Sequence, residues 1–377
     1  MRVLWIVSSL SMKVASVRLR TLLPALSLAK AGHELLVCEG LPQDDQIARA
    51  DIVVINKCFG DAYATFARTC AGRGIPVLYD LCDNVFAPDY GDGSGKAAQS
   101  VREILVHCTA LITTGPLLAD AIVRHTGFDG SVHCIPDSEE PRFAIDELLR
   151  AWEQGQGVLA EGRLTLRPAQ PFEMERQIFP EHRARTLFNA VFRKDGWLRR
   201  DRRTVLWFGT PGRMDSKTGL YALRLMKDAL AAVNAEIPLQ LLVVSSSRKL
   251  FRHHTQDYPV PCVFRPWSLL SMYGHFQSAD VTMIPNPQDA FSIVKSANRT
   301  IFSLSEGTPV IADPVPALSD FEDCTHQGDW AEGLRAYLGQ PGLAKQHIER
   351  ARKVIANRYS LASICEDWRR ALEGEGC

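Results

Sequence analysis

The chain has 377 residues, of which 46% are hydrophobic and 23% charged, values that suit two globular domains and exclude wholesale disorder. Its 43 basic and 43 acidic residues cancel, which argues against a dedicated nucleic-acid binder because such proteins carry a basic excess. The ten cysteines are scattered with no Cys-x-x-Cys pair, as expected in a reducing cytoplasm and not in a disulfide framework.

The first apolar run, Val3 to Val7, is shorter than a signal-peptide core or a membrane span. We therefore expect a cytoplasmic protein, and peripheral contact with the inner face of the membrane stays open.

The first part of the chain alternates short apolar strands with helical patterns. After the strand at 2–7, leucines recur at helix spacing from Leu19 to Leu26 and stop at Gly32. Such alternation predicts a parallel sheet with right-handed crossovers. Further strands are expected at 35–38, 52–55, 77–79, 111–113 and 132–135, and helices at 61–73, 96–107 and 116–125.

The alternation breaks at 143–203, which is rich in Arg and Glu and ends in a basic run, Arg199 to Arg203. We interpret this stretch as a linker or insertion carrying some helix. The basic run is typical of a solvated surface, and anionic lipid or a glycan is the alternative partner.

The strand–helix rhythm restarts at Thr204. We expect a strand at 204–208, a helix at 216–234, and a helix at 291–306 that ends at Gly307. The last segment, 360–372, carries an apolar stripe at helix spacing. Other strands are expected at 239–245, 262–264, 281–284 and 310–312, and other helices at 328–338 and 341–357.

The predicted fold class is therefore α/β with two Rossmann-like domains facing across a cleft. The domains are 1–142, completed by a return helix in 360–377, and 204–359, with 143–203 between them. Ligands bind parallel sheets at the carboxyl ends of the strands, which points to the loops after Val7, Tyr79, Phe208 and Ile284.

Basic residues gather at the start of the predicted helix 291–306. Lys295 and Arg299 stand four residues apart, where like charges repel, and cations are unfavourable at a helix N-terminus. A bound phosphate would remove both penalties. Pairing with Asp280 or Asp289 is the structural alternative.

Several segments resemble the bacterial group 1 glycosyltransferases, which have the architecture called GT-B. The resemblance covers nearly the whole chain outside 143–203, through short and degenerate motifs. These are Ser16 to Arg20, Ala31 to His33, Ala110 to Ala119, Val205 to Gly209, Lys295-Ser296-Ala297-Asn298-Arg299 and Glu306 to Ala312.

The resemblance implies that the second domain binds a nucleotide-sugar donor, with Lys295, Ser296, Asn298 and Arg299 around its phosphates. It also implies contacts from three residues near the first strand of that domain: Gly209, Arg213 and Lys217. The phosphates would be stabilised electrostatically without a metal or other cofactor.

The sequence departs from the family at one point. Many members carry two glutamates separated by seven residues, and Val294 and Phe302 occupy those positions here. The pair is absent, so the sequence assigns neither a retaining nor an inverting outcome.

The first domain is expected to bind the acceptor through Ser8, Ser9 and Arg18, whereas Arg20 is interpreted as surface. The first loop lacks Gly-x-Gly-x-x-Gly, which argues against a nicotinamide or flavin. Asp80 and Asp83 follow another strand, and either could be the general base toward an acceptor hydroxyl. Helix capping and loop fixation are the alternative for these two carboxylates.

Three functions are compatible with the sequence. The first is a glycosyltransferase acting on a glycan, lipid-linked or small-molecule acceptor. The second is a non-catalytic module that binds a nucleotide sugar or a protein, which the missing glutamates favour. The third is a sugar-nucleotide epimerase, for which the acid/base set is incomplete.

Overall fold

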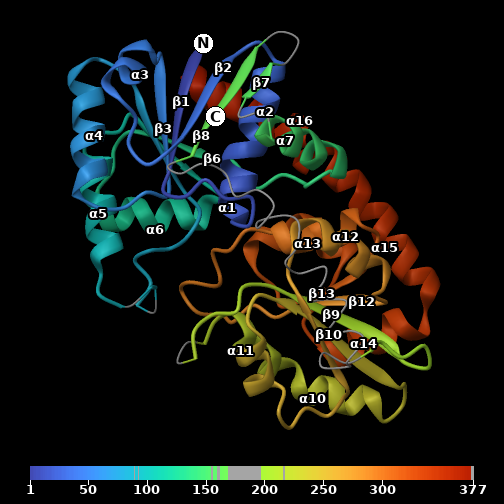
Figure 1. Ribbon diagram of the computed structural model, residues 1–377. Coiled ribbons are helices and arrows are strands. Elements are labelled where there is room, and N and C mark those ends of the chain that lie inside the picture. Colours follow the sequence, from blue (N-terminus) through green and yellow to red (C-terminus); the bar gives the residue numbers. More distant parts are fainter. Residues whose placement is uncertain are drawn as a thin grey trace. The chain divides into compact units, whose positions relative to one another are not determined.

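The computed structural model describes residues 1–88, 90–91, 93–153, 156–158, 162–168, 197–214 and 217–374. They form two compact α/β units (Figure 1). The first unit contains Met1–Glu173, Asp289–Asn298 and Asn357–Cys377, and the second contains Met174–Gln288 and Arg299–Ala356. The contacts of residues 289–298 thus place this segment in the first unit, whereas the sequence pattern assigned it to the second domain.

The first unit is built on an eight-stranded sheet in the order β6-β5-β4-β3-β1-β2-β8-β7. Every neighbouring pair is parallel except β7 with β8. Its central strands are buried along their whole length, as expected for a parallel sheet covered on both faces. The strands are β1 (Arg2–Val7), β2 (Glu34–Glu39), β3 (Ile52–Asn56), β4 (Val77–Leu81), β5 (Ala110–Thr113), β6 (Ser131–Cys134), β7 (Gln156–Val158) and β8 (Arg163–Arg167).

Helices of the first unit follow most of these strands, close to the predicted positions. The predicted first helix is divided by a π-helical turn, η1. The helices are α1 (Ala15–Val17), η1 (Arg18–Leu22), α2 (Leu23–Lys30), α3 (Asp44–Arg49), α4 (Asp61–Gly72), α5 (Lys96–Leu105), α6 (Pro116–Thr126), α7 (Arg142–Glu153) and α16 (Leu361–Glu373).

The chain after residue 142 is less of a linker than its charged composition predicts. Helix α7 buries Ala144, Ile145 and Leu148, and β8 extends the sheet by pairing with β2. Alternation of buried Leu164 and Leu166 with polar residues explains this added strand. Residues 169–196 of the predicted linker lie outside the described part of the chain.

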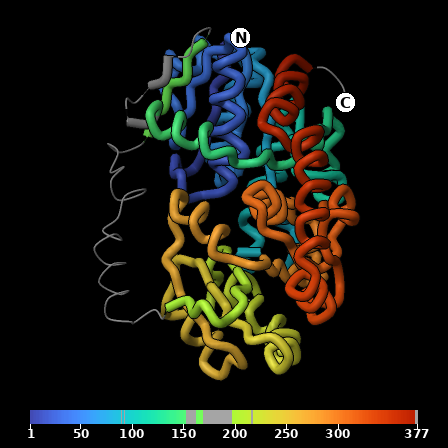
Figure 2. Tube along the Cα trace, turned by 90° about the vertical axis from the view of Figure 1, so that its right-hand side faces the viewer, coloured from blue at the N-terminus to red at the C-terminus, as the bar shows by residue number. Residues whose placement is uncertain are grey.

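The C-terminal helix returns to the first unit, as predicted. Figure 2 shows α16, in red, beside the blue N-terminal elements, and α16 packs against α2. Trp368 is fully buried, and its ring lies 4.7 Å from the ring of Trp5 on β1. The last helix thereby closes the core over the first strand.

The second unit is built on a six-stranded parallel sheet in the order β11-β10-β9-β12-β13-β14. This is the doubly wound Rossmann order, in which the chain changes direction across the sheet between β9 and β12. The strands are β9 (Arg203–Phe208), β10 (Leu239–Ser245), β11 (Cys262–Pro266), β12 (Val281–Ile284), β13 (Val310–Ala312) and β14 (His326–Gln327).

Helices of the second unit confirm the predicted alternation but shift two boundaries. They are η2 (Gly219–Tyr221), α10 (Ala222–Asn234), α11 (Arg248–His254), α12 (Leu269–Gln277), α13 (Asn298–Ser305), η3 (Pro316–Cys324), α14 (Trp330–Gly339) and α15 (Pro341–Val354). Helix α13 begins at the last residue that the first unit contributes before it, and η4 (Ile355–Tyr359) spans the point where the chain returns to the first unit.

The prediction of one helix over 291–306 is wrong in its first half, because α13 begins only at Asn298. Asp289 provides the reason: its Oδ1 accepts hydrogen bonds from the backbone N–H groups of Phe291, at 2.9 Å, and Ser292, at 2.8 Å. These bonds hold a separate turn ahead of the helix. Lys295 therefore precedes α13, and only Arg299 lies in its first turn.

Candidate functional site

The switch point of the second sheet is formed by the residues that follow β9 and β12. Ser245, at the end of β10, donates a hydrogen bond of 2.9 Å to the carbonyl of Gly209, just after β9. The backbone N–H of Asn286, just after β12, donates to Asp313 over 2.8 Å. The first bond joins the ends of β9 and β10, and the second joins those of β12 and β13, at the edge where doubly wound sheets bind ligands.

Arg299 reaches this switch point from the first turn of α13. One guanidinium nitrogen donates to the side-chain oxygen of Asn286 over 3.2 Å. Burial lowers the pKa of Arg299 to about 10, and within the described residues no carboxylate forms an ion pair with it. A half-buried cation without a counter-ion is costly, so this position favours a bound anion.

Gly209 lies beside the Arg299 guanidinium and, having no side chain, leaves space next to it. A Cβ added at this position would lie 3.1 Å from the Trp207 ring and 3.8 Å from the Arg299 guanidinium. Any side chain here would therefore crowd the space beside the guanidinium. Gly209, predicted for close approach of the diphosphate, thus lies beside the Arg299 guanidinium.

The predicted Arg213 and Lys217 lie in the exposed loop between β9 and η2. Gly212 and Gly219 both have left-handed backbones, and a Cβ on either would meet backbone of the other side of the loop at 2.4 Å. The loop thus closes on itself. Lys217 does not open the next helix, as predicted for 216–234, because Gly219 and the 3₁₀ turn η2 precede α10.

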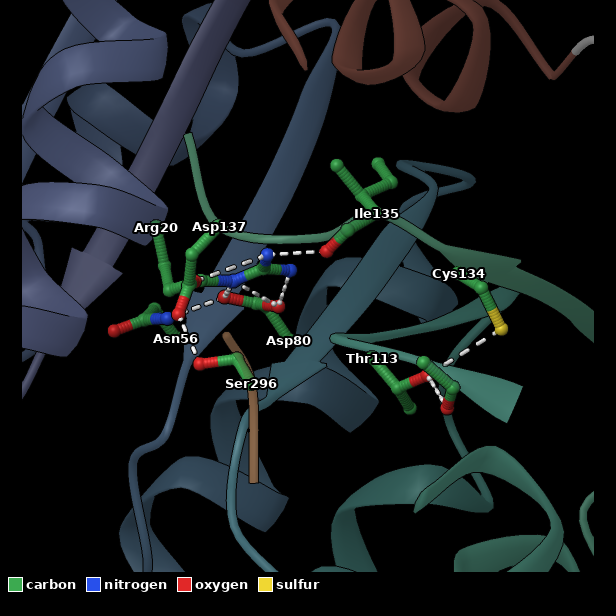
Figure 3. A network of polar contacts seen from close by, with 9 residues as sticks. Arg20, Asn56, Asp80, Thr113, Cys134, Ile135, Asp137 and Ser296 are labelled. Carbon is green, nitrogen blue, oxygen red and sulfur yellow. Dashed lines mark hydrogen bonds and ion pairs between the residues drawn. The ribbon is translucent and has the colours of Figure 1, made fainter. Parts of the chain in front are cut away.

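A buried polar network lies at the carboxyl ends of β3 and β4 in the first unit (Figure 3). Arg20 has no exposed surface and donates to Asp80 over 2.6 Å, while Asn56 donates to the same carboxylate. The Arg20 guanidinium also lies 3.6 Å from Asp137. The interpretation of Arg20 as a surface residue is therefore wrong: carboxylates and the Trp368 ring enclose it.

Asp80 and Asp83 differ in their surroundings. Asp80 is completely buried, and its pKa is raised by burial against the opposing effect of Arg20. Burial also acts to raise the pKa of Asp83, but the ammonium groups of Lys295 and Lys57 outweigh it and hold the pKa well below its usual value. Asp80 has no exposed surface and is held by Arg20, so an acceptor hydroxyl cannot reach it, and a carboxylate as acidic as Asp83 is a weak base.

Lys295 binds Asp83 inside the first unit, and Lys57 binds the other carboxylate oxygen. The next residues of the same segment contact Asp137: Ser296 donates over 2.5 Å and Asn298 over 3.3 Å. The sequence grouped Lys295, Ser296 and Asn298 with Arg299. The structure brings the first three to the polar network of the first unit, and Arg299 to Asn286 of the second.

The remaining acceptor residues predicted in the first domain lie near the end of β1. Ser8 and Ser9 are exposed directly after the strand. Arg18 is 3% exposed, forms an ion pair of 2.8 Å with Glu140 and donates to the Met12 carbonyl over 2.7 Å. Arg18 therefore braces the loop that carries the serines.

Sequence reasoning missed Asn56, Lys57, Asp137 and Asn286. Asn56 ends β3, Lys57 and Asn286 follow β3 and β12 within two residues, and Asp137 comes three residues after β6, so strand-end position was the available signal. No spacing indicated that Asp83 and Lys295, 212 residues apart, would meet.

Comparison with solved structures places this architecture among known proteins. A glycosyltransferase from Rickettsia africae superposes with a TM-score of 0.57 at 14% identity, covering 99% of this chain and 98% of its own. The chain has the GT-B fold. Anabaena HepE, solved in complex with UDP and glucose, matches this GT-B chain with a TM-score of 0.59 at 10% identity over 99% of each chain.

A third GT-B neighbour is a UDP-forming α,α-trehalose-phosphate synthase from Burkholderia xenovorans. Its TM-score is 0.55 at 10% identity, with 99% of this chain and 98% of that chain covered. No protein-family model and no curated protein match the sequence. At these identities the likeness establishes the fold alone.

The described residues hold neither a membrane-spanning helix nor a cluster of metal ligands. No helix there is long and apolar enough to cross a bilayer. In the same residues, no three His, Cys, Asp or Glu side chains gather as metal ligands would.

Proposed function

We propose that this GT-B protein is a glycosyltransferase that moves a sugar from a nucleotide-sugar donor to a glycan, lipid-linked or small-molecule acceptor. The observation that carries the proposal is Arg299, a half-buried guanidinium without a carboxylate partner in the described residues, at the switch point of a Rossmann sheet. An anionic ligand supplies the missing counter-charge, and a nucleotide diphosphate is the anion suited to such a sheet edge.

The chemistry asked of this site is stabilisation of a leaving group. An acceptor oxygen forms a bond to the anomeric carbon while the bond from that carbon to the diphosphate breaks, and negative charge grows on the departing phosphate. Arg299 and the N-terminal amides of α13 meet that charge electrostatically without a metal. The exposed Arg213 and Lys217 add positive charge on the loop beside Gly209.

This assignment gives Lys295 a different part from Arg299. Because its ammonium is held by Asp83 in the first unit, we assign the diphosphate chiefly to Arg299. Asp80 and Asp83 likewise act in our proposal as fixed partners of cations, and the proton of the acceptor hydroxyl passes to water as the new bond to the anomeric carbon forms.

Calorimetric titration with UDP, GDP, ADP and dTDP tests the donor site. At least one should bind the wild-type protein, and Arg299→Ala should weaken that binding about tenfold or more, since charge-assisted hydrogen bonds are lost. Arg335→Ala is the matched control, because Arg335 is an exposed arginine of the second unit paired with Glu236. Absence of binding by all four nucleotides would refute the donor assignment.

A non-catalytic nucleotide-sugar binder is the second candidate. Phe302 is 6% exposed and packs edge-on against Phe208, so an apolar core side chain fills one position of the family's glutamate pair. Val294, at the other position, packs against the core of the first unit. Donor turnover distinguishes the two: an enzyme releases nucleoside diphosphate in an Arg299-dependent manner, and a binding module releases none.

A further inference from the structure

A cluster of two lysines, one carboxylate and two aromatic rings lies on the outer side of the polar network in the first unit. Lys57 and Lys295 each donate to a different oxygen of Asp83. The Lys295 ammonium lies 3.8 Å from the centre of the Phe291 ring, which is 5.9 Å from the ring of Tyr90. We name these five residues the lysine cluster.

The lysine cluster has an excess of positive charge, because two ammonium groups share one carboxylate. The inner network has the opposite excess, with Asp80 and Asp137 around Arg20, but neutral donors from Asn56 and Ser296 also bind those carboxylates. Among the described residues, no carboxylate other than Asp83 forms an ion pair with Lys57 or Lys295.

The two ammonium groups have more N–H donors than Asp83 accepts. An ammonium group has three N–H donors, and Asp83 accepts one from each lysine. The lysine side chains are 27% and 33% exposed, whereas that of Asp83 is 11% exposed. Both lysine side chains are therefore more exposed than the carboxylate that they share.

Lys57 is held in place by a strained backbone. With φ of 48°, it is the one non-glycine residue of the described chain with a left-handed conformation. Strain of this kind is concentrated at functional sites, where the surrounding structure maintains it. It places the ammonium at the carboxyl end of β3, beside the Asp83 loop that follows β4.

We propose that the lysine cluster binds an anionic group of the acceptor, a phosphate monoester or a carboxylate on a sugar. This inference rests on the proposed function, since it makes the first unit the acceptor unit. The ammonium groups provide charge-assisted hydrogen bonds to the anion. Phe291 and Tyr90 provide flat apolar surfaces for the carbon face of a sugar ring.

Phosphate titration in an Arg299→Ala background tests the proposal, because that change removes the cation assigned to the donor. The full chain should bind inorganic phosphate and glucose 6-phosphate more tightly than glucose. Lys295→Met and Lys57→Asn should each weaken phosphate binding about tenfold. Asparagine is chosen at 57 because it tolerates a left-handed backbone, and Lys30→Met, at an exposed lysine paired with Glu147, is the control.

Asp83→Asn separates a binding site from a mere brace. If the cluster binds anions, removing the competing carboxylate should strengthen phosphate binding about tenfold, and phosphate should raise the Tm of this variant more than that of its parent. If the two lysines serve only to hold Asp83 in place, phosphate binding by Asp83→Asn should be unchanged or weaker.

Comparison of glucuronate with glucose 6-phosphate then assigns the anion, and lysine-dependent binding of either supports the site. Phosphate affinity that neither lysine substitution alters would overturn the inference. Nucleotide binding by the wild-type protein reports separately on the donor site, so the two failures are distinguishable.

Discussion

Basic side chains lie at the carboxyl ends of both sheets, but the two units differ in whether a carboxylate pairs with them. In the first unit, Arg20, Lys57 and Lys295 all have carboxylate partners. In the second, the guanidinium of Arg299 donates to the neutral side chain of Asn286 and, among the described residues, pairs with no carboxylate. A basic residue at a strand end therefore indicates a ligand where the protein's own carboxylates do not fully balance the positive charge. Arg299 has no carboxylate partner in the described residues, and Lys57 and Lys295 share a single one.

The largest expected effect on stability comes from removing the buried ion pair between Arg20 and Asp80 in the first unit. Arg20→Met leaves the buried Asp80 without its counter-ion and should lower the free energy of unfolding of the first unit by about 3–5 kcal/mol. Urea denaturation followed by circular dichroism measures it. Arg2→Met, which removes an exposed ion pair with Asp51 in the same unit, should cost under about 1 kcal/mol. Equal losses of stability in the two variants would contradict the role of Arg20 as the counter-ion of buried Asp80.

Gly209→Ala tests the proposed diphosphate site of the second unit while keeping the Arg299 guanidinium. The added Cβ would meet the Trp207 ring at 3.1 Å and narrow the space beside Arg299. We expect nucleoside diphosphate binding to weaken about tenfold, with a loss of stability of about 1–2 kcal/mol from crowding. Titration calorimetry and thermal unfolding measure the two effects. Gly274→Ala is the control, since a Cβ there meets nothing within 4 Å; unchanged affinity in Gly209→Ala would count against close approach of the ligand.

The pH dependence of stability sharpens the comparison at Asp83. Because its pKa is lower in the folded protein than in the unfolded chain, its contribution is fully present above the unfolded value of about 4 and is lost as pH falls through that value toward the lower folded pKa. The difference in unfolding free energy between wild type and Asp83→Asn should therefore shrink between pH 6 and pH 3. A difference that stays constant would show that the lysines do not hold this carboxylate ionised.

The smallest effect is expected where Arg299 is removed in the absence of ligand. Arg299→Met deletes a half-buried charge that burial disfavours, so unfolding free energy should stay within about 1 kcal/mol of the wild type or rise. Thermal unfolding without nucleotide measures it. A loss as large as that of Arg20→Met would mean that Arg299 is a structural cation.

Most of the fold was predictable from the sequence, because buried parallel strands appear as short apolar runs between helical patterns. Both sheets, the restart at Thr204 and the return helix were predicted from those patterns. The start of α13 was not, since it depends on Asp289 holding a separate turn. Strand β8 was missed because its pattern is short and lies in a charged stretch.

The candidate site was only partly predictable, for a physical reason. The family resemblance assigned Gly209 and Arg299 to the donor site, and Arg299 also stood out as a cation near a predicted helix start. The structure places these two residues close together in the second unit. The partner that decides whether a cation is compensated comes from elsewhere in the chain, as Asp83 does for Lys295 and Asp80 for Arg20. Such pairing is a property of the folded chain and has no local pattern in the sequence.

A crystal structure with a bound nucleoside diphosphate tests the central claim most directly. We predict electron density for the diphosphate against the Arg299 guanidinium, beside the backbone of Gly209, while Lys295 keeps its bond to Asp83. Density for the diphosphate away from Arg299, with that guanidinium still bonded only to Asn286, would contradict it.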